Sequence, residues 1–420
     1  MNADRHRRGA GFDVRYFRRD QSHRESHAQD AAHLAPVAAH PLASADPPAI
    51  ITDAHGLAEM IEHLKAAGSF AFDSEFIGER SYEPLLCLVQ AATTRRVFLV
   101  DPLAGLDLTA LWELVASPAV EKVVLAGQQD FGPAVARTGR PPANIMDVQI
   151  AAGFVHVEYP LSLARLLDRF VGVAVGKAHS FTHWDNRPLT AAQARYAADD
   201  VRYLPAAREA IGRQLAALGR ADWARQECAA ALEDIALYRP PPEMLYLRIR
   251  GRERLGRRGL AVLRELAILR DRAARHEKVP ARTLLKDGIL LALSRRPAHK
   301  VADLAAVKGL PRPVEHKYGR QIVEASARAL ALPEADMPRP EPEEPPEMKE
   351  RVDAAFAAIA AFCTQRSIAP ALVASRKEVS RLIRAAGDGR KPDDALAREH
   401  RLMRGWRKEL LGELVGKVLR

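Results

Sequence analysis

The stretch FAFDSEF, residues 70–76, combines the alternation of a β-strand with two acidic side chains. Side chains of a strand alternate between the two faces of a sheet, so Asp73 and Glu75 point to one face and Ser74 to the other. Carboxylates on a largely apolar strand are costly unless something neutralises them. The pair therefore indicates either an exposed end of a sheet or a site that holds a positive group.

The surrounding segments predict the rest of the sheet. Short apolar runs at residues 85–92 and 96–102 follow closely and favour an antiparallel meander of three strands. Further strands are predicted at 120–127 and from residue 144, alternating with helices, and the long helix at 190–218 is broken near Pro205. The pattern is typical of an α/β domain with a mixed five-stranded sheet flanked by helices.

Two later acidic positions could join the first pair. Asp130 closes KVVLAGQQD (122–130), although alone it could be a helix-start acid favoured by the helix dipole. In RYAADDVRYL (195–204), Tyr196 and Asp200 are four residues apart and share one helix face. Four carboxylates without cysteine or histidine ligands suit Mg²⁺ or Mn²⁺. Two such ions are a recurring device for phosphodiester cleavage.

In this order, FDSEF, KVVLAGQQD and YAADD resemble the three exonuclease motifs of the DEDD superfamily, and the tyrosine before the last aspartate resembles its DEDDy branch. Their contexts, such as WDNRPLTAAQARYAADDVRYL (184–204), look like the ribonuclease D family. The resemblance implies a ribonuclease H-like fold. It also implies a 3′–5′ exoribonuclease that trims RNA with a free 3′ end, tRNA precursors above all, and releases nucleoside 5′-monophosphates.

The resemblance also implies roles for individual residues. Two divalent ions, Mg²⁺ or Mn²⁺, would be held by the catalytic carboxylates Asp73, Glu75, Asp130 and Asp200. Tyr196 would orient the attacking water, and Asp199 would be a solvated neighbour of the ligand. Substrate binding would fall to Phe76, Arg80, Tyr82 and Gln90, with plain core packing as the alternative for Phe76.

Some positions depart from the family's pattern. Leu125 stands where the family often has His, and Phe181 and His183 stand where it often has Arg and Asp. None of these is a metal ligand, so they bear on substrate preference and not on the reaction. His179 and His183 have the spacing of a zinc site, but no third ligand is evident and we expect no zinc. We expect Asp147 to cap a helix.

Composition divides the chain into five parts. Residues 1–47 are polar and predict a disordered N-terminal extension, followed by the exonuclease domain at 48–238. Residues 239–332 resemble an HRDC domain, an all-α bundle. Residues 333–348, rich in proline and acid, predict an extended linker. Residues 349–420 look like a second, degenerate HRDC-like bundle, since both helical regions open with a long amphipathic helix and continue with a helix started by proline.

Charge and composition bear on partners. The formal net charge is +10, and residues 245–300 hold 16 Lys or Arg against 5 Asp or Glu. This excess favours a nucleic-acid surface over a merely solvated face. No apolar run approaches the roughly 18 residues of a membrane helix. Three scattered cysteines and the lack of a secretory signal favour a cytoplasmic protein, with no membrane or obligate protein partner.

Two other functions fit parts of the sequence. A 3′–5′ DNA exonuclease of the same superfamily would differ in a contact to the 2′-hydroxyl, which the sequence does not place. A catalytically inactive RNA-binding protein could share the fold, but the complete set of Asp73, Glu75, Asp130, Tyr196 and Asp200 argues against it.

Overall fold

The computed structural model describes residues 36–175, 183–342, 344–387 and 400–419. Its sheet has the order β1-β4-β3-β2-β5-β6. Strands β2, β3 and β4 form the predicted antiparallel meander, while β1 pairs with β4, and β5 with β2 and β6, in parallel. The strands are β1 (Ala49–Ile51), β2 (Ser69–Ile77), β3 (Leu85–Ala92), β4 (Val97–Val100), β5 (Glu121–Val124) and β6 (Ile145–Asp147).

In the described part of the chain the sheet has six strands, where the sequence predicts five. The additional strand, β1, is three residues long and directly follows Pro47 and Pro48. A segment this short shows no alternation of its own, so only its pairing with β4 identifies it as a strand.

Helices cover both faces of this sheet domain. On one face, α2, α3 and α4 enclose a core that includes Phe70, Phe72 and Phe131. On the other, α7 packs across β2, β3 and β4, and the predicted break at Pro205 separates α7 from α8. The helices are α2 (Ala54–Ala67), η2 (Pro102–Ala104), α3 (Thr109–Ala116), α4 (Gly132–Thr138), α5 (Val148–Ala152), α6 (Leu163–Val171), α7 (Ala191–Arg202), α8 (Leu204–Ala217), α9 (Ala221–Leu232) and α10 (Ile235–Tyr238).

The sheet domain starts before residue 48. Residues 1–35 of the predicted disordered extension lie outside the described residues, but residues 36–47 pack against α7 and α8. The Tyr203 hydroxyl donates to the carbonyl of Ala38 at 3.0 Å, and the Arg202 guanidinium donates to the carbonyls of Ser44 and Asp46. The prediction of disorder is therefore wrong for 36–47. These contacts come from residues more than 150 positions away, which the local composition does not reveal.

Two helical bundles follow. The first, from η3 to η6, has its own core around Leu263, Leu290 and Ile322. Its elements are η3 (Pro242–Arg248), η4 (Arg252–Arg254), α11 (Arg257–Glu277), α12 (Ala281–Leu284), α13 (Asp287–Arg295), η5 (Val301–Ala306), α14 (Arg312–Leu330) and η6 (Glu334–Asp336). The second comprises α15 (Pro346–Thr364), α16 (Pro370–Val373), α17 (Arg376–Gly387), η7 (Arg401–Met403) and α19 (Gly405–Leu419).

Within the described residues, the two bundles share one order of elements from α11 and α15 onward. Each has a long helix, a four-residue helix next to a proline, a helix of 9 or 12 residues, a 3₁₀ turn and a final long helix. This order favours the predicted origin as two copies of one unit. Between the bundles, the described residues 338–342, 344 and 345 form no helix or strand, and Glu341 and Glu344 pair with cations of α17.

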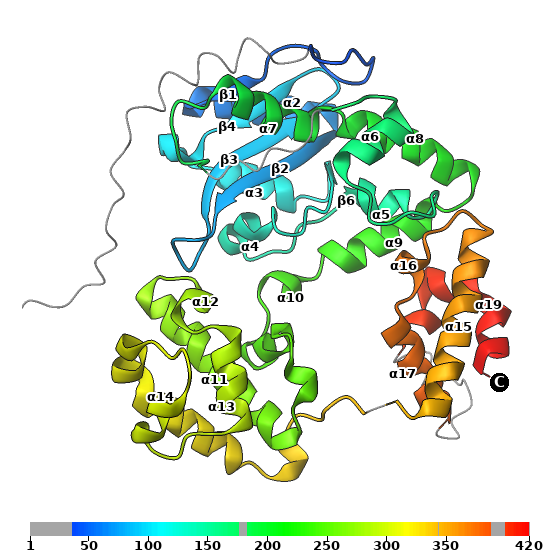
Figure 1. Ribbon diagram of the computed structural model, residues 1–420. Helices are drawn as coiled ribbons and strands as arrows, with labels where there is room; N and C mark the ends of the chain where they lie inside the picture. The colour runs from blue at the N-terminus through cyan, green and yellow to red at the C-terminus, as the bar shows by residue number, and fades with distance from the viewer. Residues whose placement is uncertain (1–35, 176–182, 343, 388–399, 420) are drawn as a thin grey trace, which may run out of the picture.

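The bundles differ in how they join the sheet domain. Figure 1 shows the first bundle below the sheet domain, near the β2–β3 turn, and the second beside α9. The second bundle shares one continuous core with α5, α8 and α9. The N–H of Ala369 donates to the carbonyl of Gly153 at 2.8 Å, and any side chain at Gly153 would meet Leu372. The second bundle is thus an integral part of the sheet domain's packing.

A buried ionic network stabilises the interface between the second bundle and α9. Glu227 of α9 accepts hydrogen bonds from the Arg407 guanidinium at 2.6 and 2.8 Å, from Trp406 at 2.9 Å and from Arg401 at 2.6 Å. These hydrogen bonds and the arginine charges outweigh burial and hold the pKa of Glu227 below its ordinary value. Trp406 also packs against Phe154 with 4.7 Å between ring centroids, so it is a packing residue of this contact.

Glu227→Gln should destabilise the protein strongly. It leaves the guanidinium of Arg407, which is 4% exposed, without its counter-charge. Breaking a buried ion pair in this way costs about 3–5 kcal/mol of the free energy of unfolding, which denaturant titration measures. Glu62→Gln, which removes an exposed pair with Lys65, is the control and should change stability by less than about 0.5 kcal/mol. Equal stabilities of the two variants would contradict this role of the network.

None of the described helices is long and apolar enough to cross a membrane.

Candidate active site

The first two predicted carboxylates lie on a central strand that extends beyond its neighbour. Asp73 and Glu75 are on β2, which pairs with β5 only over Ser69–Ala71 and with β3 over Ala71–Ile77. The edge of β2 beyond Ala71 is therefore open on the β5 side. Both side chains are partly buried, so the alternative of a plainly exposed sheet end does not hold.

Asp130 fills this open edge. It lies in the loop after β5, is 8% exposed, and accepts a hydrogen bond from the Ser74 hydroxyl at 2.5 Å. The following helix, α4, begins at Gly132, and no side chain caps its start. Asp130 is therefore not the helix-start acid of the alternative interpretation, because its contact is with β2.

Helix α7 brings the remaining predicted residues over β2. A capping box between Thr190 and Gln193 fixes where α7 starts, and its face towards the sheet carries Tyr196 and, one turn later, Asp200. The Tyr196 hydroxyl hydrogen-bonds the carboxylate of Asp200. The Tyr196 ring lies beside that of Trp184, with 6.1 Å between centroids, in a small apolar cluster.

Asp199 is not the solvated neighbour that the sequence suggests. Its carboxylate pairs with Arg195 at 2.5 Å and with Arg202 at 3.0 Å, and only 15% of its side chain is exposed. The two adjacent aspartates therefore have different roles. Asp200 faces the carboxylate cluster, while Asp199 compensates the charge of Arg202, which is 1% exposed.

Burial raises the proton affinity of all four carboxylates, and neighbouring carboxylates of the cluster add to this at Asp73 and Glu75. Burial, followed by the charges of Asp130 and Asp200, raises the pKa of Asp73 well above its ordinary value. Burial and the same two charges raise the pKa of Glu75 to about 8. Burial is also the main cause that raises the pKa of Asp130 to about 6 and that of Asp200 to about 7. Four partly buried anions that repel one another need a cation to be ionised together.

The donor set fits a hard divalent cation. It consists of carboxylate oxygens alone, the ligands that Mg²⁺ and Mn²⁺ prefer. Within the described ranges, no three of these groups already stand as a closed set of ligands around one point. Ser74 occupies one oxygen of Asp130, and the like charges repel. The charge of a bound cation would supply the attraction that draws the oxygens inward.

The four predicted substrate-binding residues differ in their contacts. Phe76 is partly buried and follows a β-bulge that shifts the register between β2 and β3 after Glu75, a feature that re-aims side chains. Arg80 is exposed and pairs with Asp185 at 2.7 Å. Gln90 is fully buried on β3.

Tyr82 makes a contact between domains. Its hydroxyl donates to Asp271 of the first helical bundle at 2.6 Å, and the Arg275 guanidinium lies 4.6 Å from the centre of its ring. Its backbone N–H also donates to the carbonyl of Lys278. Because the hydroxyl is already committed, these contacts favour a role in docking the bundle over the predicted role in substrate binding.

Two residues that support the site, Trp184 and Arg187, were not predicted from the sequence. Arg187 donates to both carboxylate oxygens of Asp101, at 2.5 and 2.7 Å, and to the carbonyls of Cys87 and Trp184. It thereby ties the segment before α7 to β3 and supports Trp184 beside Tyr196. Arg187 and Trp184 stand in the quoted WDNRPLT segment, but only their tertiary contacts show what they do. His179 and Phe181 lie outside the described residues, so the zinc expectation is not addressed.

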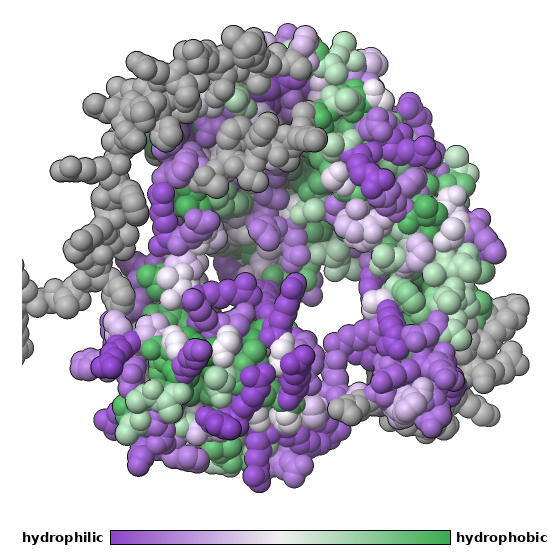
Figure 2. All heavy atoms as spheres, in the orientation of Figure 1, coloured by the Kyte–Doolittle hydropathy of each residue, from purple (hydrophilic) through white to green (hydrophobic). Residues whose placement is uncertain are grey.

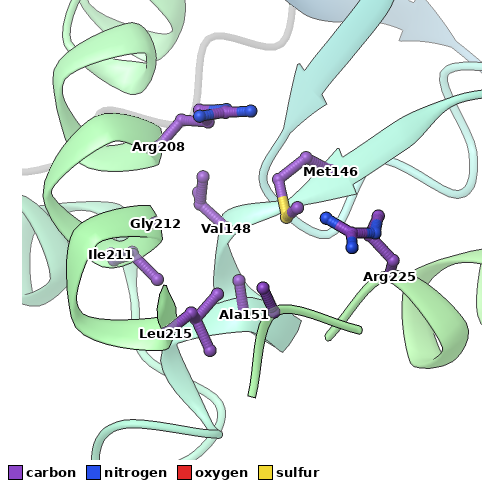
Figure 3. Close-up of a pocket in the computed structure, with 9 residues that line it drawn as sticks. Met146, Val148, Ala151, Arg208, Ile211, Gly212, Leu215 and Arg225 are labelled. Atoms are coloured by element: carbon purple, nitrogen blue, oxygen red, sulfur yellow. The ribbon is translucent and has the colours of Figure 1, made fainter. Parts of the chain in front are cut away.

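A separate pocket shares no residue with the carboxylate cluster. Figure 3 shows it between the β6–α5 segment and α8, with an apolar floor that includes Val148 and Leu215. Its two arginines are both paired, Arg208 with Glu121 and Arg225 with Asp222. It therefore offers no free charge for a ligand, and the carboxylate cluster remains the candidate active site.

Comparisons with known proteins agree with this geometry. Residues 48–216 match the family model of a 3′-5′ exonuclease, and residues 259–325 match that of the HRDC domain. The chain is 36% identical over 370 residues to ribonuclease D of Gluconacetobacter diazotrophicus, covering 87% of this chain and 91% of that protein. It is 33% identical over 378 residues to ribonuclease D of Granulibacter bethesdensis, with the same coverage of both chains.

Solved structures give the same result. The crystal structure of Escherichia coli RNase D, described as an exoribonuclease involved in structured RNA processing, matches with a TM-score of 0.74 and 27% identity, over 89% of this chain and 98% of that one. The catalytic core of RRP6 from Trypanosoma brucei, at 22% identity and a TM-score of 0.52, shows the same fold. By its sequence relatives, its two family matches and its architecture, this chain belongs to the ribonuclease D family of 3′–5′ exoribonucleases, whose fold implies the use of divalent metal ions.

Proposed function

We propose that this exoribonuclease works with two divalent ions, Mg²⁺ or Mn²⁺, held by Asp73, Glu75, Asp130 and Asp200. The observation that carries the proposal is the convergence of four partly buried carboxylates from β2, the loop after β5, and α7, with every pKa raised. Such a cluster is costly to the fold unless a cation compensates it. Carboxylates with strongly raised pKa values are found mainly at functional sites.

The chain's own residues would divide the chemistry between them. Bound ions of this kind activate a water molecule and stabilise the leaving oxygen of a phosphodiester. Tyr196 would use its hydroxyl to orient the attacking water, since it lies beside Asp200 on the face of α7 that covers the cluster. Trp184 and Arg187 would keep the Tyr196 ring in place.

We propose that the substrates are structured RNAs with free 3′ ends, tRNA precursors among them. Phe76 and Arg80 would contact the terminal nucleotides, because Phe76 directly follows Glu75 on β2 and Arg80 is exposed in the segment after β2. The first helical bundle exposes cations such as Arg254, Arg272, Arg295 and Arg296, and Figure 2 shows its surface in this view as mainly hydrophilic. These cations would bind the phosphate backbone. Three buried free cysteines fit the expected cytoplasmic site of action.

Labelled oligonucleotides test this proposal. We expect processive or stepwise loss of 5′-monophosphates from RNA with a 3′-hydroxyl in Mg²⁺ or Mn²⁺, and none after chelation. A 3′-phosphate should block the reaction, because the terminal phosphodiester would no longer present a free end to the carboxylates. DNA of the same sequence is the control for sugar preference. Cleavage of circular RNA would contradict the exonuclease mechanism, and full activity in a chelator would contradict the metal site.

A further inference from the structure

Gln90 has an unusual environment. It is 0% exposed, and neither its amide nitrogen nor its amide oxygen has a hydrogen-bond partner. Within the described parts of the chain, no other buried side-chain nitrogen or oxygen is left in this state. A buried polar group without a partner costs about 1–3 kcal/mol, so each such group needs an explanation.

The position of Gln90 suggests that explanation. It lies on β3 directly opposite Asp73 of β2, and directly opposite residues of an antiparallel pair point to the same face. Their Cβ atoms are then about 4.5–5.5 Å apart, within reach of a glutamine amide. That face of the sheet is covered by α7, which carries Asp200 and Tyr196. The unpartnered amide is therefore aimed at the carboxylate cluster.

Full burial excludes the role that the family resemblance suggested. RNA cannot reach a side chain that is 0% exposed between the sheet and α7, so Gln90 does not bind substrate directly. A partner must come from within the cluster, and Asp73 is the nearest candidate by register. The Asp73 carboxylate accepts a hydrogen bond from the N–H of Ser74 at 2.9 Å and has further acceptor sites available.

We infer that Gln90 is a positioning residue for Asp73, whose carboxylate receives a hydrogen bond from the Gln90 amide when the site holds its cations. The inference rests on the proposed function of Asp73 as a ligand. A second hydrogen bond would fix the orientation of the carboxylate and prevent its rotation away from the ion. Partners of this kind typically change metal affinity by about 10–100-fold when they are removed.

The test compares Mn²⁺ affinity with stability in the full chain, without RNA. Gln90→Met keeps the length of the side chain and removes its amide, and Gln90→Leu repeats the test with a different shape. We expect Mn²⁺ binding, measured by titration calorimetry, to weaken by about tenfold or more. The melting temperature of the ion-free protein should stay equal or rise, because an unsatisfied amide has been removed.

Gln149→Leu is the matched control. This glutamine of α5 donates to the carbonyl of Leu161 at 2.9 Å, so its loss should lower the melting temperature and leave Mn²⁺ affinity unchanged. Unchanged Mn²⁺ affinity in both Gln90 variants would overturn the inference. So would a lowered melting temperature of the ion-free protein in both, which would make Gln90 a structural residue.

The variant Asp73→Asn distinguishes a wrong role for Gln90 from a wrong metal site. If Asp73→Asn loses Mn²⁺ affinity while the Gln90 variants keep it, the ligand assignment stands and the role of Gln90 is wrong. If Asp73→Asn binds Mn²⁺ as tightly as the unaltered chain, the proposed metal site itself is wrong.

Discussion

Asp200→Asn should reduce single-turnover RNA cleavage by more than about 10³-fold at saturating RNA. The substitution keeps the size of the side chain but removes a charged ligand from the cluster on β2 and α7. Removal of one hydrogen-bond donor to a transition state lowers a rate by about 10²–10³-fold. The decrease in rate should be larger here, because the site loses a negative charge as well as an oxygen ligand. Quenched-flow measurement of 5′-monophosphate release from RNA with a 3′-hydroxyl gives the rate.

Asp199→Asn is the control, one residue away on the same helix. It breaks the pairs with Arg195 and Arg202 and should therefore destabilise the protein. Its cleavage rate per folded molecule should stay within a few-fold of that of the unaltered chain. If Asp199→Asn lost as much activity as Asp200→Asn, the division of work between the two aspartates would be wrong.

Tyr196→Phe should reduce the single-turnover rate by about 10²–10⁴-fold while RNA and metal affinity stay nearly unchanged. Phenylalanine keeps the ring that packs beside Trp184 and removes the hydroxyl that hydrogen-bonds Asp200. The proposed role of that hydroxyl is to orient the attacking water, so its loss should affect the chemical step. RNA binding measured in Ca²⁺, beside cleavage in Mg²⁺, separates affinity from chemistry.

Tyr203→Phe is the matched control for this substitution. Tyr203 follows α7 directly, is 1% exposed, and donates its hydroxyl to the carbonyl of Ala38. Loss of the Tyr203 hydroxyl should lower the free energy of unfolding by about 1 kcal/mol and leave the RNA cleavage rate unchanged. A Tyr196→Phe variant that cleaves at the original rate would make Tyr196 a packing residue. A Tyr196→Phe variant that loses RNA affinity together with the cleavage rate would show that Tyr196 contacts the substrate.

Much of the site could be predicted because local periodicity determines which side chains share a face. Strand alternation places Asp73 and Glu75 together, and helical spacing places Tyr196 and Asp200 together. The cap at Asp147 was predictable because aspartate is favoured at a helix start, and the structure confirms it, since the Asp147 carboxylate accepts from the N–H groups of Gln149 and Ile150. The order of the motifs then indicated the family.

What the sequence did not reveal depends on contacts between distant residues. Strand β1 is too short to show a pattern, and residues 36–47 are ordered by contacts with Arg202 and Tyr203. The buried Glu227–Arg407 pair joins residues 180 positions apart. The ion pairs of Asp199, by contrast, could have been predicted, because Arg195 and Arg202 are four and three residues away on the same helix. The expectation of a solvated Asp199 side chain did not take these two arginines into account.

The central claim is that the four carboxylates hold the ions that hydrolyse RNA. An anomalous difference map from crystals soaked in Mn²⁺ with a non-hydrolysable RNA tests it most directly. We expect two peaks about 3.5–4 Å apart, both within bonding distance of oxygens from Asp73, Glu75, Asp130 and Asp200. Two peaks elsewhere on the chain, or none at this cluster while RNA occupies the site, would contradict it.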